Sequence, residues 1–293
     1  MPNLDDRPVH ALSFDIEDWF HMVEIPGLDD PSEWPNLPSL VERRTEEILD
    51  VCREAGVRAT FFILGWIAER HPRLVAAIAA EGHELGSHSH WHRAVYEMTP
   101  ESFQRDLEDS IAAIESAAGR APTCFRAPSF SIKPGSEWAF DAIAESGLRF
   151  DASLFPARRG HGGYPCPDHP HMVVSPRGVR LPELPMSTMS VAGARLCFSG
   201  GGYLRLLPLA MIRRGFRQCE REMRPAVVYL HPRDFAPDCP RCPMPAHRRF
   251  KGYVGLATTR RKLEALVGEY RFGTCGEVVG QAGRSASEDG IES

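Results

Sequence analysis

Residues 11–19 read Ala-Leu-Ser-Phe-Asp-Ile-Glu-Asp-Trp, a mostly apolar run that leads directly into an acidic turn. The run predicts a buried strand over Ala11–Ile16. Asp15, Glu17 and Asp18 place three carboxylates within four residues, and a cation or a proton has to relieve their repulsion if they are buried. Asp15 and Glu17 share one face of an extended chain, because side chains alternate along a strand. The stretch therefore predicts either a cation site or a solvated acidic turn that caps the strand.

Outward from this strand, short apolar runs alternate with amphipathic segments, which favours an α/β protein with a single barrel-like domain. The pattern predicts further strands at 59–64, 83–87, 123–126, 148–151 and 226–230. It predicts helices at 39–56, 67–80, 99–118, 137–146, 206–222 and 259–267. Ser39 and Glu42 form a capping-box pattern at the start of the first helix. Residues 156–178 are rich in Pro, Gly and His and are predicted to form a long loop.

The composition is that of an ordinary globular protein, with 293 residues, 43% of them hydrophobic, and a net charge of −5. This mild acidity argues against a protein that holds nucleic acid by its phosphates. We expect a cytoplasmic protein, because the N-terminus lacks the pattern of a secretion signal and no apolar run is long enough to span a membrane. Among eight cysteines, Cys239 and Cys242 have a suggestive spacing. It fits a plain loop better than a structural zinc site completed by His247 and Cys166.

Three histidines lie within residues 88–92. His88 and His92 are four residues apart, so on one helical turn both imidazoles would face a common ion, while His90 would point elsewhere. A carboxylate from the acidic turn would complete a three-ligand site with positions open for water and substrate, which is the pattern of a catalytic metal. The alternative is an exposed polar turn.

Two further polar residues lie at or just after the ends of predicted strands. Arg126 precedes a rigid turn at Pro128, where its guanidinium is placed to fix a carboxylate and the Ser129 N–H to face the same site. His231 follows a buried run and suits an acid–base role. Taken singly, Arg126 fits a surface salt bridge equally well and His231 fits a structural histidine better. Asp15, Arg126 and His231 together occupy strand ends, where barrel enzymes carry their functional residues.

In this order, the motifs resemble those of the polysaccharide deacetylases of carbohydrate esterase family four, which have the NodB-homology fold. The resemblance covers residues 10–235 and implies a distorted (β/α) barrel of about seven strands. Residues 201–208 and 231–235 further resemble the subfamily found with exosortase and exopolysaccharide gene clusters. That likeness implies a C-terminal extension over 236–280, packed on the same domain. Residues 281–293 are predicted to form a disordered tail.

The resemblance also implies a role for each matching residue. The implied roles are general base for Asp15, metal ligands for His88 and His92, orientation of the base for Arg126, and general acid for His231.

The acidic turn departs from the commonest family pattern. Many members have two adjacent aspartates where this chain reads Asp-Ile-Glu-Asp from Asp15. We expect Glu17 to be the metal carboxylate because of its spacing from Asp15, with Asp18 as the alternative. The expected carboxylate partner of Arg126 is Asp151.

The implied function is removal of N-acetyl groups from an amino-sugar polysaccharide or its precursor by a metal-dependent hydrolase, with Zn²⁺ as the expected metal. The Ser129 N–H is expected to stabilise the oxyanion, and Trp19 and Phe130 to stack on a sugar ring, with ordinary packing as their alternative. One alternative function is an amidohydrolase of the same fold acting on a non-carbohydrate amide or cyclic ureide. Another is a glycan- or metal-binding protein without turnover, against which Asp15 and His231 argue because binding alone needs neither a base nor an acid.

Overall fold

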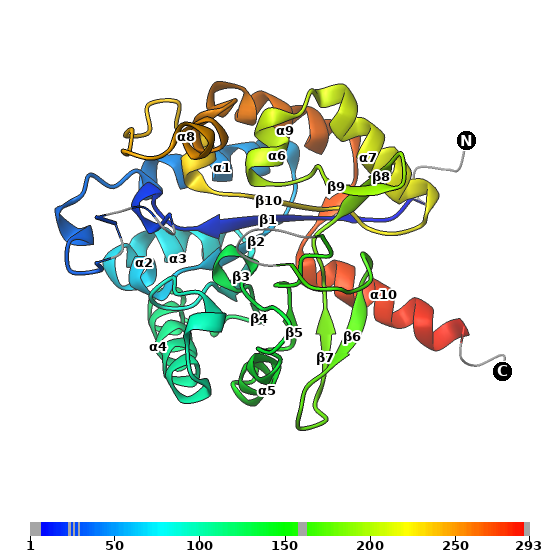
Figure 1. Ribbon diagram of the computed structural model, residues 1–293, viewed down its shortest axis with the longest axis horizontal. Helices are drawn as coiled ribbons and strands as arrows, with labels where there is room; N and C mark the ends of the chain where they lie inside the picture. The colour runs from blue at the N-terminus through cyan, green and yellow to red at the C-terminus, as the bar shows by residue number, and fades with distance from the viewer. Residues whose placement is uncertain (1–6, 23–24, 26, 29, 158–162, 290–293) are drawn as a thin grey trace.

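The computed structural model of the protein describes residues 7–22, 25, 27–28, 30–157 and 163–289. Its main sheet has nine strands in the order β10-β1-β2-β3-β4-β5-β7-β6, with β11 paired to the start of β1 (Figure 1). The path from β10 to β7 is parallel throughout. Its strands are β10 (Val227–Leu230), β1 (His10–Ile16), β2 (Thr60–Ile63), β3 (Glu84–Ser87), β4 (Cys124–Phe125), β5 (Phe150–Asp151) and β7 (Arg180–Glu183).

The sheet is curled into a half-barrel with helices outside it (Figure 1). Among the described strands, β10 and β6 (His171–Val174) end the path and do not pair with each other. The predicted distorted barrel of about seven strands is therefore confirmed, with an open rather than a closed circuit.

The central strand β1 is buried over its whole length, which explains its continuous apolar run. A parallel strand covered on both faces shows no alternation of apolar and polar residues. Helices that pack around the sheet supply this cover (Figure 1). The helices of the fold are α1 (Val41–Ala55), α2 (Gly65–Arg70), α3 (Pro72–Ala80), α4 (Pro100–Ala118), α5 (Trp138–Glu145), α6 (Gly201–Leu206), α7 (Leu209–Arg221), α8 (Ala246–Tyr253), α9 (Thr259–Glu269) and α10 (Cys275–Asp289).

One predicted helix is broken in two by a proline. The helix predicted at 67–80 is α2 followed by α3, which begins at Pro72. The helix predicted at 206–222 is α7, which begins after Pro208, and α6 lies before it. Proline lacks an N–H and its ring clashes with the preceding turn, but it fits the first turn of a helix.

The region after β5 departs most from the prediction. The expected loop at 156–178 contains β6, which forms an antiparallel hairpin with β7, and a second hairpin joins β8 (Thr188–Val191) to β9 (Ala194–Cys197). At the C-terminus α10 extends to Asp289, so the tail predicted to be disordered is helical up to that residue. Residues 290–293 lie outside the described part of the chain. No helix within the described residues is long and apolar enough to cross a membrane.

Short 3-10 turns follow several of the strands. They are η2 (Trp19–His21), η3 (Trp34–Asn36), η4 (Val95–Glu97), η5 (Pro128–Phe130), η6 (Pro232–Phe235) and η7 (Leu256–Thr258), and the remaining strand β11 is Phe272–Gly273. Three of these turns, η2, η5 and η6, begin within four residues of the ends of β1, β4 and β10. Because neighbouring parallel strands end at the same edge of a sheet, these turns bring the predicted site residues together.

Candidate active site

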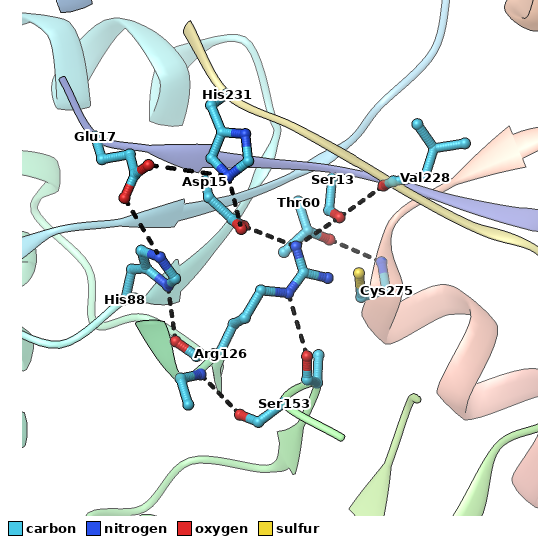
Figure 2. A network of polar contacts seen from close by, with 12 residues as sticks. Ser13, Asp15, Glu17, Thr60, His88, Arg126, Ser153, Val228, His231 and Cys275 are labelled. Atoms are coloured by element: carbon cyan, nitrogen blue, oxygen red, sulfur yellow. Dashed lines mark hydrogen bonds and ion pairs between the residues drawn. The ribbon is translucent and has the colours of Figure 1, made fainter. Parts of the chain in front are cut away.

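The carboxyl ends of β1, β3, β4 and β10 converge on one polar cluster (Figure 2). Asp15 lies on β1, Arg126 follows β4 and His231 follows β10. Asp15 is at the centre, with one carboxylate oxygen 2.7 Å from Arg126 Nη1 and the other 3.7 Å from His231 Nε2. His231 Nε2 is also 3.9 Å from Glu17 Oε1. The structure thus brings the predicted base, acid, arginine and metal carboxylate into a single site.

Glu17, His88 and His92 offer ligand atoms that all lie within 4.8 Å of one another, and all three residues are buried. Glu17 Oε2 is 4.0 Å from His88 Nε2 and forms a close ion pair with His92 Nε2. Within the described residues, no other group of three or more His, Cys, Asp or Glu side chains has this arrangement. Burial raises the pKa of Glu17, but the three surrounding histidines, His92 foremost, outweigh it and hold that pKa well below its usual range.

The segment that carries His88 and His92 is an irregular loop after β3, so the expectation of a helical turn is wrong. Ser89 and His92 have φ values of 67° and 54°, in the left-handed region that few side chains adopt. Asp106 of α4 fixes the loop, accepting hydrogen bonds from the His90 and Trp91 amides at 2.7 and 3.2 Å. Nothing in the sequence pattern pointed to Asp106.

The protonation of His88 is set by its second ring nitrogen. Its Nδ1 lies 2.7 Å from the carbonyl oxygen of Arg126. A carbonyl only accepts hydrogen bonds, so Nδ1 carries the proton and Nε2 presents a lone pair to the site. Burial lowers the pKa of His88 to about 4, which keeps the ring neutral.

The donor set suits a divalent cation. Glu17 Oε2 is buried, and its close partner, His92 Nε2, belongs to the same group of candidate ligands. Two imidazole nitrogens and a carboxylate oxygen form a ligand set typical of catalytic Zn²⁺ sites, which keep a further position open.

Asp18, the alternative metal carboxylate, has a different role. Its carboxylate accepts hydrogen bonds from the Ser39 hydroxyl at 2.5 Å and from the Leu40 and Val41 amides at 3.0 and 3.3 Å. Asp18 therefore caps the N-terminus of α1 from a distant part of the chain. The predicted capping box of Ser39 and Glu42 is wrong, because α1 begins at Val41 and the Ser39 hydroxyl donates to Asp18.

Arg126 is completely buried, and Asp15 is its carboxylate partner. Arg126 Nη1 also donates to the Ser13 hydroxyl at 2.8 Å, and Nε donates to the Ala152 carbonyl at 3.2 Å. The guanidinium lies 4.0 Å from the centre of the Phe62 ring. Contacts with Ser13, Ala152 and Phe62 therefore fix the guanidinium that donates to Asp15.

The expected pairing of Arg126 with Asp151 is wrong. Asp151 accepts a hydrogen bond from the Ser153 hydroxyl at 2.6 Å and interacts with the buried Glu183. Burial raises the pKa of Asp151, and burial together with the Asp151 carboxylate raises that of Glu183. The two buried carboxyl groups thus hinder each other's ionisation, and the carboxylate hydrogen-bonded to Arg126 is Asp15.

His231 has a partner that the sequence reasoning did not single out. Asp234 Oδ2 lies 2.9 Å from both the backbone N and the Nδ1 of His231, and Asp234 Oδ1 is 2.8 Å from Arg205 Nε. Burial lowers the pKa of His231, but the Asp234 carboxylate outweighs it and raises the pKa to about 9. Asp234 stands three residues after His231, a spacing that a 3-10 turn folds into contact.

The two residues expected to stack on sugar are packed inside the protein. Trp19 is 6% exposed and donates its indole N–H to the Pro38 carbonyl, and Phe130 is 4% exposed against Phe155 and Tyr229. Rings this buried present little surface to a sugar, so the packing alternative accounts for both. Ser129, whose backbone N–H is the expected donor to the oxyanion, lies in η5 with a φ of 54°, in the left-handed region.

Cys239 and Cys242 form a buried loop without a metal-ligand cluster among the described residues. The side chain of His247 lies outside the described part. Cys242 N donates to the Tyr253 hydroxyl at 2.9 Å, and that hydroxyl donates to the Pro240 carbonyl at 2.8 Å. The loop is therefore held by a tyrosine, in agreement with the plain-loop interpretation.

Comparisons with known families give matches over both halves of the chain. Residues 7–144 match the family described as polysaccharide deacetylase, and residues 152–280 match a domain of unknown function, DUF3473. Just under half of the chain is thus similar to the polysaccharide deacetylases, and the match to DUF3473 covers most of the rest. We predict a domain boundary at residue 235, whereas the second match begins at residue 152. His231 and Asp234 come from the second segment and the other site residues from the first.

Curated relatives are similar to part of the chain. A peptidoglycan-N-acetylglucosamine deacetylase of Bacillus cereus is 34% identical over 119 residues, covering 36% of this chain and 43% of the relative. A chitooligosaccharide deacetylase of Rhizobium leguminosarum bv. trifolii is 35% identical over 108 residues, covering 36% and 47%. The chain spans less than half the length of these relatives.

Solved structures share the fold. A putative polysaccharide deacetylase from Mycobacterium smegmatis has a TM-score of 0.66 at 21% identity, covering 98% of this chain and 93% of that one. A pseudoenzyme of carbohydrate esterase family four from Bacillus anthracis has a TM-score of 0.50 at 15% identity, covering 95% and 66%. Because the fold includes a pseudoenzyme, catalytic activity depends on the residues of the site and not on the fold alone.

Proposed function

We propose that the protein is a metal-dependent N-deacetylase that hydrolyses the acetamide of an amino sugar in a polysaccharide or its precursor. The observation that carries the proposal is the position of His231, whose Nε2 lies 3.7 Å from Asp15 and 3.9 Å from Glu17. A base, an acid and a set of metal ligands thus surround one small volume. The matching family and its relatives support the choice of an acetylated amino sugar as substrate.

Glu17, His88 and His92 would hold the metal. When bound there, a divalent cation such as Zn²⁺ supplies positive charge that polarises a carbonyl and lowers the pKa of water. His88 is prepared for this role because its Nδ1 proton is engaged by the Arg126 carbonyl.

Asp15 serves as the general base in this proposal. It takes a proton from the water whose oxygen adds to the acetyl carbon. Arg126 orients Asp15 by a charge-assisted hydrogen bond of 2.7 Å, which leaves the other carboxylate oxygen turned to the site. The Ser129 N–H is the proposed donor to the acetyl oxygen, a contact worth about 3–4 kcal/mol in other hydrolases.

His231 serves as the general acid. The C–N bond breaks as His231 Nε2 gives its proton to the sugar nitrogen, so that the products are acetate and a free amine. Asp234 supports this step by holding Nδ1 at 2.9 Å, which keeps the ring protonated and aimed at the site.

Acetate release from chitooligosaccharides tests the proposal, measured with added Zn²⁺ and again after chelation. Asp15→Asn keeps the shape of the side chain but removes the base, and we expect a loss of about 10²- to 10⁴-fold in kcat. Asp109→Asn, an exposed site on α4, is the matched control and should retain activity. Equal activity in the wild type and Asp15→Asn would refute the mechanism. Activity confined to a non-carbohydrate amide would indicate the amidohydrolase alternative.

A further inference from the structure

The segment from Cys239 to Lys262 has a charge opposite to that of the whole chain. It contains seven Lys and Arg residues and no Asp or Glu, whereas the chain has a net charge of −5. A solvated surface usually mixes both signs of charge. A one-sided segment of this kind attracts anions.

A cleft of about 580 Å³ lies in this segment, between the loop of Cys239–Cys242 and α8. Arg241 and Arg249 line it and are both exposed, and Phe250 beside them is 57% exposed. Two guanidinium groups that share a cleft with an aromatic ring provide ionic contacts and a stacking surface for one ligand. The other lining residues are Ala246, Tyr253 and Val254.

Arg241 is held in place before any ligand arrives. Its guanidinium lies 4.2 Å from the centre of the Tyr253 ring. The Tyr253 hydroxyl also bonds the residues on either side of Arg241, donating to the Pro240 carbonyl and accepting from the Cys242 amide. An arginine fixed in this way loses little conformational entropy on binding, whereas a free surface arginine loses much more.

The cleft is joined to the proposed active site through η6. Arg233, two residues after His231, donates to the Gly252 carbonyl at 3.0 Å, and its guanidinium lies 5.9 Å from the Tyr253 ring. Arg205, which pairs with Asp234, donates to the Gly252 and Val254 carbonyls at the end of α8. Figure 1 shows α8 on the side of the molecule at which β1 ends.

We infer that this cleft binds an anionic group, a carboxylate or a phosphate, of the same molecule whose acetamide enters the active site. The inference rests on the proposed function and adds to it the chemical class of the substrate, an acidic amino-sugar glycan or a phosphorylated precursor of one. Arginine binds both kinds of anion in a bidentate manner, and Phe250 offers a ring face to a neighbouring sugar. The DUF3473 segment would then supply the acid His231 and also the part of the site that selects acidic substrates.

Equilibrium binding tests the inference without requiring turnover. The ligands are neutral chitotetraose, a tetrasaccharide of alternating glucuronic acid and N-acetylglucosamine, and uridine diphosphate N-acetylglucosamine. The full-length protein is compared with the double variant Arg241→Gln, Arg249→Gln. The matched control removes two arginines from the surface of α7, Arg214→Gln and Arg217→Gln. Thermal unfolding shows whether each variant is folded.

We expect the wild type and the control to bind at least one anionic ligand about tenfold more tightly than chitotetraose, with a preference that high salt weakens. The double variant should lose this preference and keep its affinity for chitotetraose. A preference for the tetrasaccharide identifies the anion as a sugar carboxylate, and one for the nucleotide sugar identifies it as a phosphate.

Equal binding of neutral and anionic ligands, no binding of either, or the same loss in the α7 control would overturn the inference. It would also be overturned if the double variant lost only binding to vesicles of phosphatidylglycerol and phosphatidylcholine, because the cleft would then be a membrane contact. Acetate release without a preference for anionic ligands refutes this inference alone. A preference without acetate release from any acetylated amino sugar refutes the proposed deacetylase instead.

Discussion

The two carboxylates after β1 should respond in opposite ways to isosteric substitution. Glu17→Gln removes the only charged member of the three-residue ligand set. Outer partners of metal ligands contribute about 10- to 100-fold in affinity, so loss of the carboxylate ligand itself should weaken Zn²⁺ binding by more than about a hundredfold. Asp18→Asn should leave Zn²⁺ affinity unchanged, because Asp18 caps α1.

Asp18→Asn should instead lower the free energy of unfolding. Asp18 Oδ2 accepts from the Ser39 hydroxyl at 2.5 Å, the Leu40 amide at 3.0 Å and the Val41 amide at 3.3 Å. Asparagine has one acceptor oxygen where the carboxylate has two, so either the Trp19 amide on Oδ1 or the Val41 amide on Oδ2 loses its acceptor. Loss of a helix cap together with unpaired buried donors costs about 1–3 kcal/mol.

Two measurements separate the variants: Zn²⁺ content and affinity by equilibrium dialysis, and the free energy of unfolding in urea with the metal removed by chelation. The wild type and Asp109→Asn serve as controls. If Asp18→Asn lost the metal while Glu17→Gln retained it, the ligand set derived from the geometry would be wrong. If Asp18→Asn were as stable as the wild type, the capping role would be wrong.

Three further outcomes are expected. Asp234→Asn should lower kcat about a hundredfold with little change in KM or metal content, because Asp234 holds the Nδ1 of His231; an altered KM with unchanged kcat would contradict this role. Chelation should abolish acetate release and lower the thermal unfolding temperature, and Zn²⁺ should restore both, whereas Glu17→Gln should show neither change. His10 has a pKa lowered by burial to about 3, so below pH 6.5 the unfolded state binds a proton that the folded state does not. Stability should therefore fall by about 1.4 kcal/mol per pH unit from pH ~6 towards pH ~3. In His10→Phe the slope of unfolding free energy against pH should flatten, and an unchanged slope would show that other groups cause it.

Much of the site was predictable because it lies at the ends of apolar strands. Asp15, Arg126 and His231 each follow a short buried run, and parallel strands end at a common edge whatever the helices between them do. A proline also marks a helix break, but the amphipathic pattern continues across Pro72, so α2 and α3 were predicted as one helix. The hairpins after β5 lacked any strong alternating pattern and were missed.

The sequence by itself determined the residue types of the site and their order, because strand-end placement is a local property of apolar runs. Only the tertiary structure decided which carboxylate serves which purpose. Glu17 faces the histidines, while Asp18 faces the start of α1, which lies more than twenty residues further along the chain. His88 and His92 meet through left-handed loop residues rather than a helix, and Asp106 holds that loop from α4. The partners of these side chains depend on how distant segments of the chain pack together. The spacing of residues along the sequence carries no information about that packing.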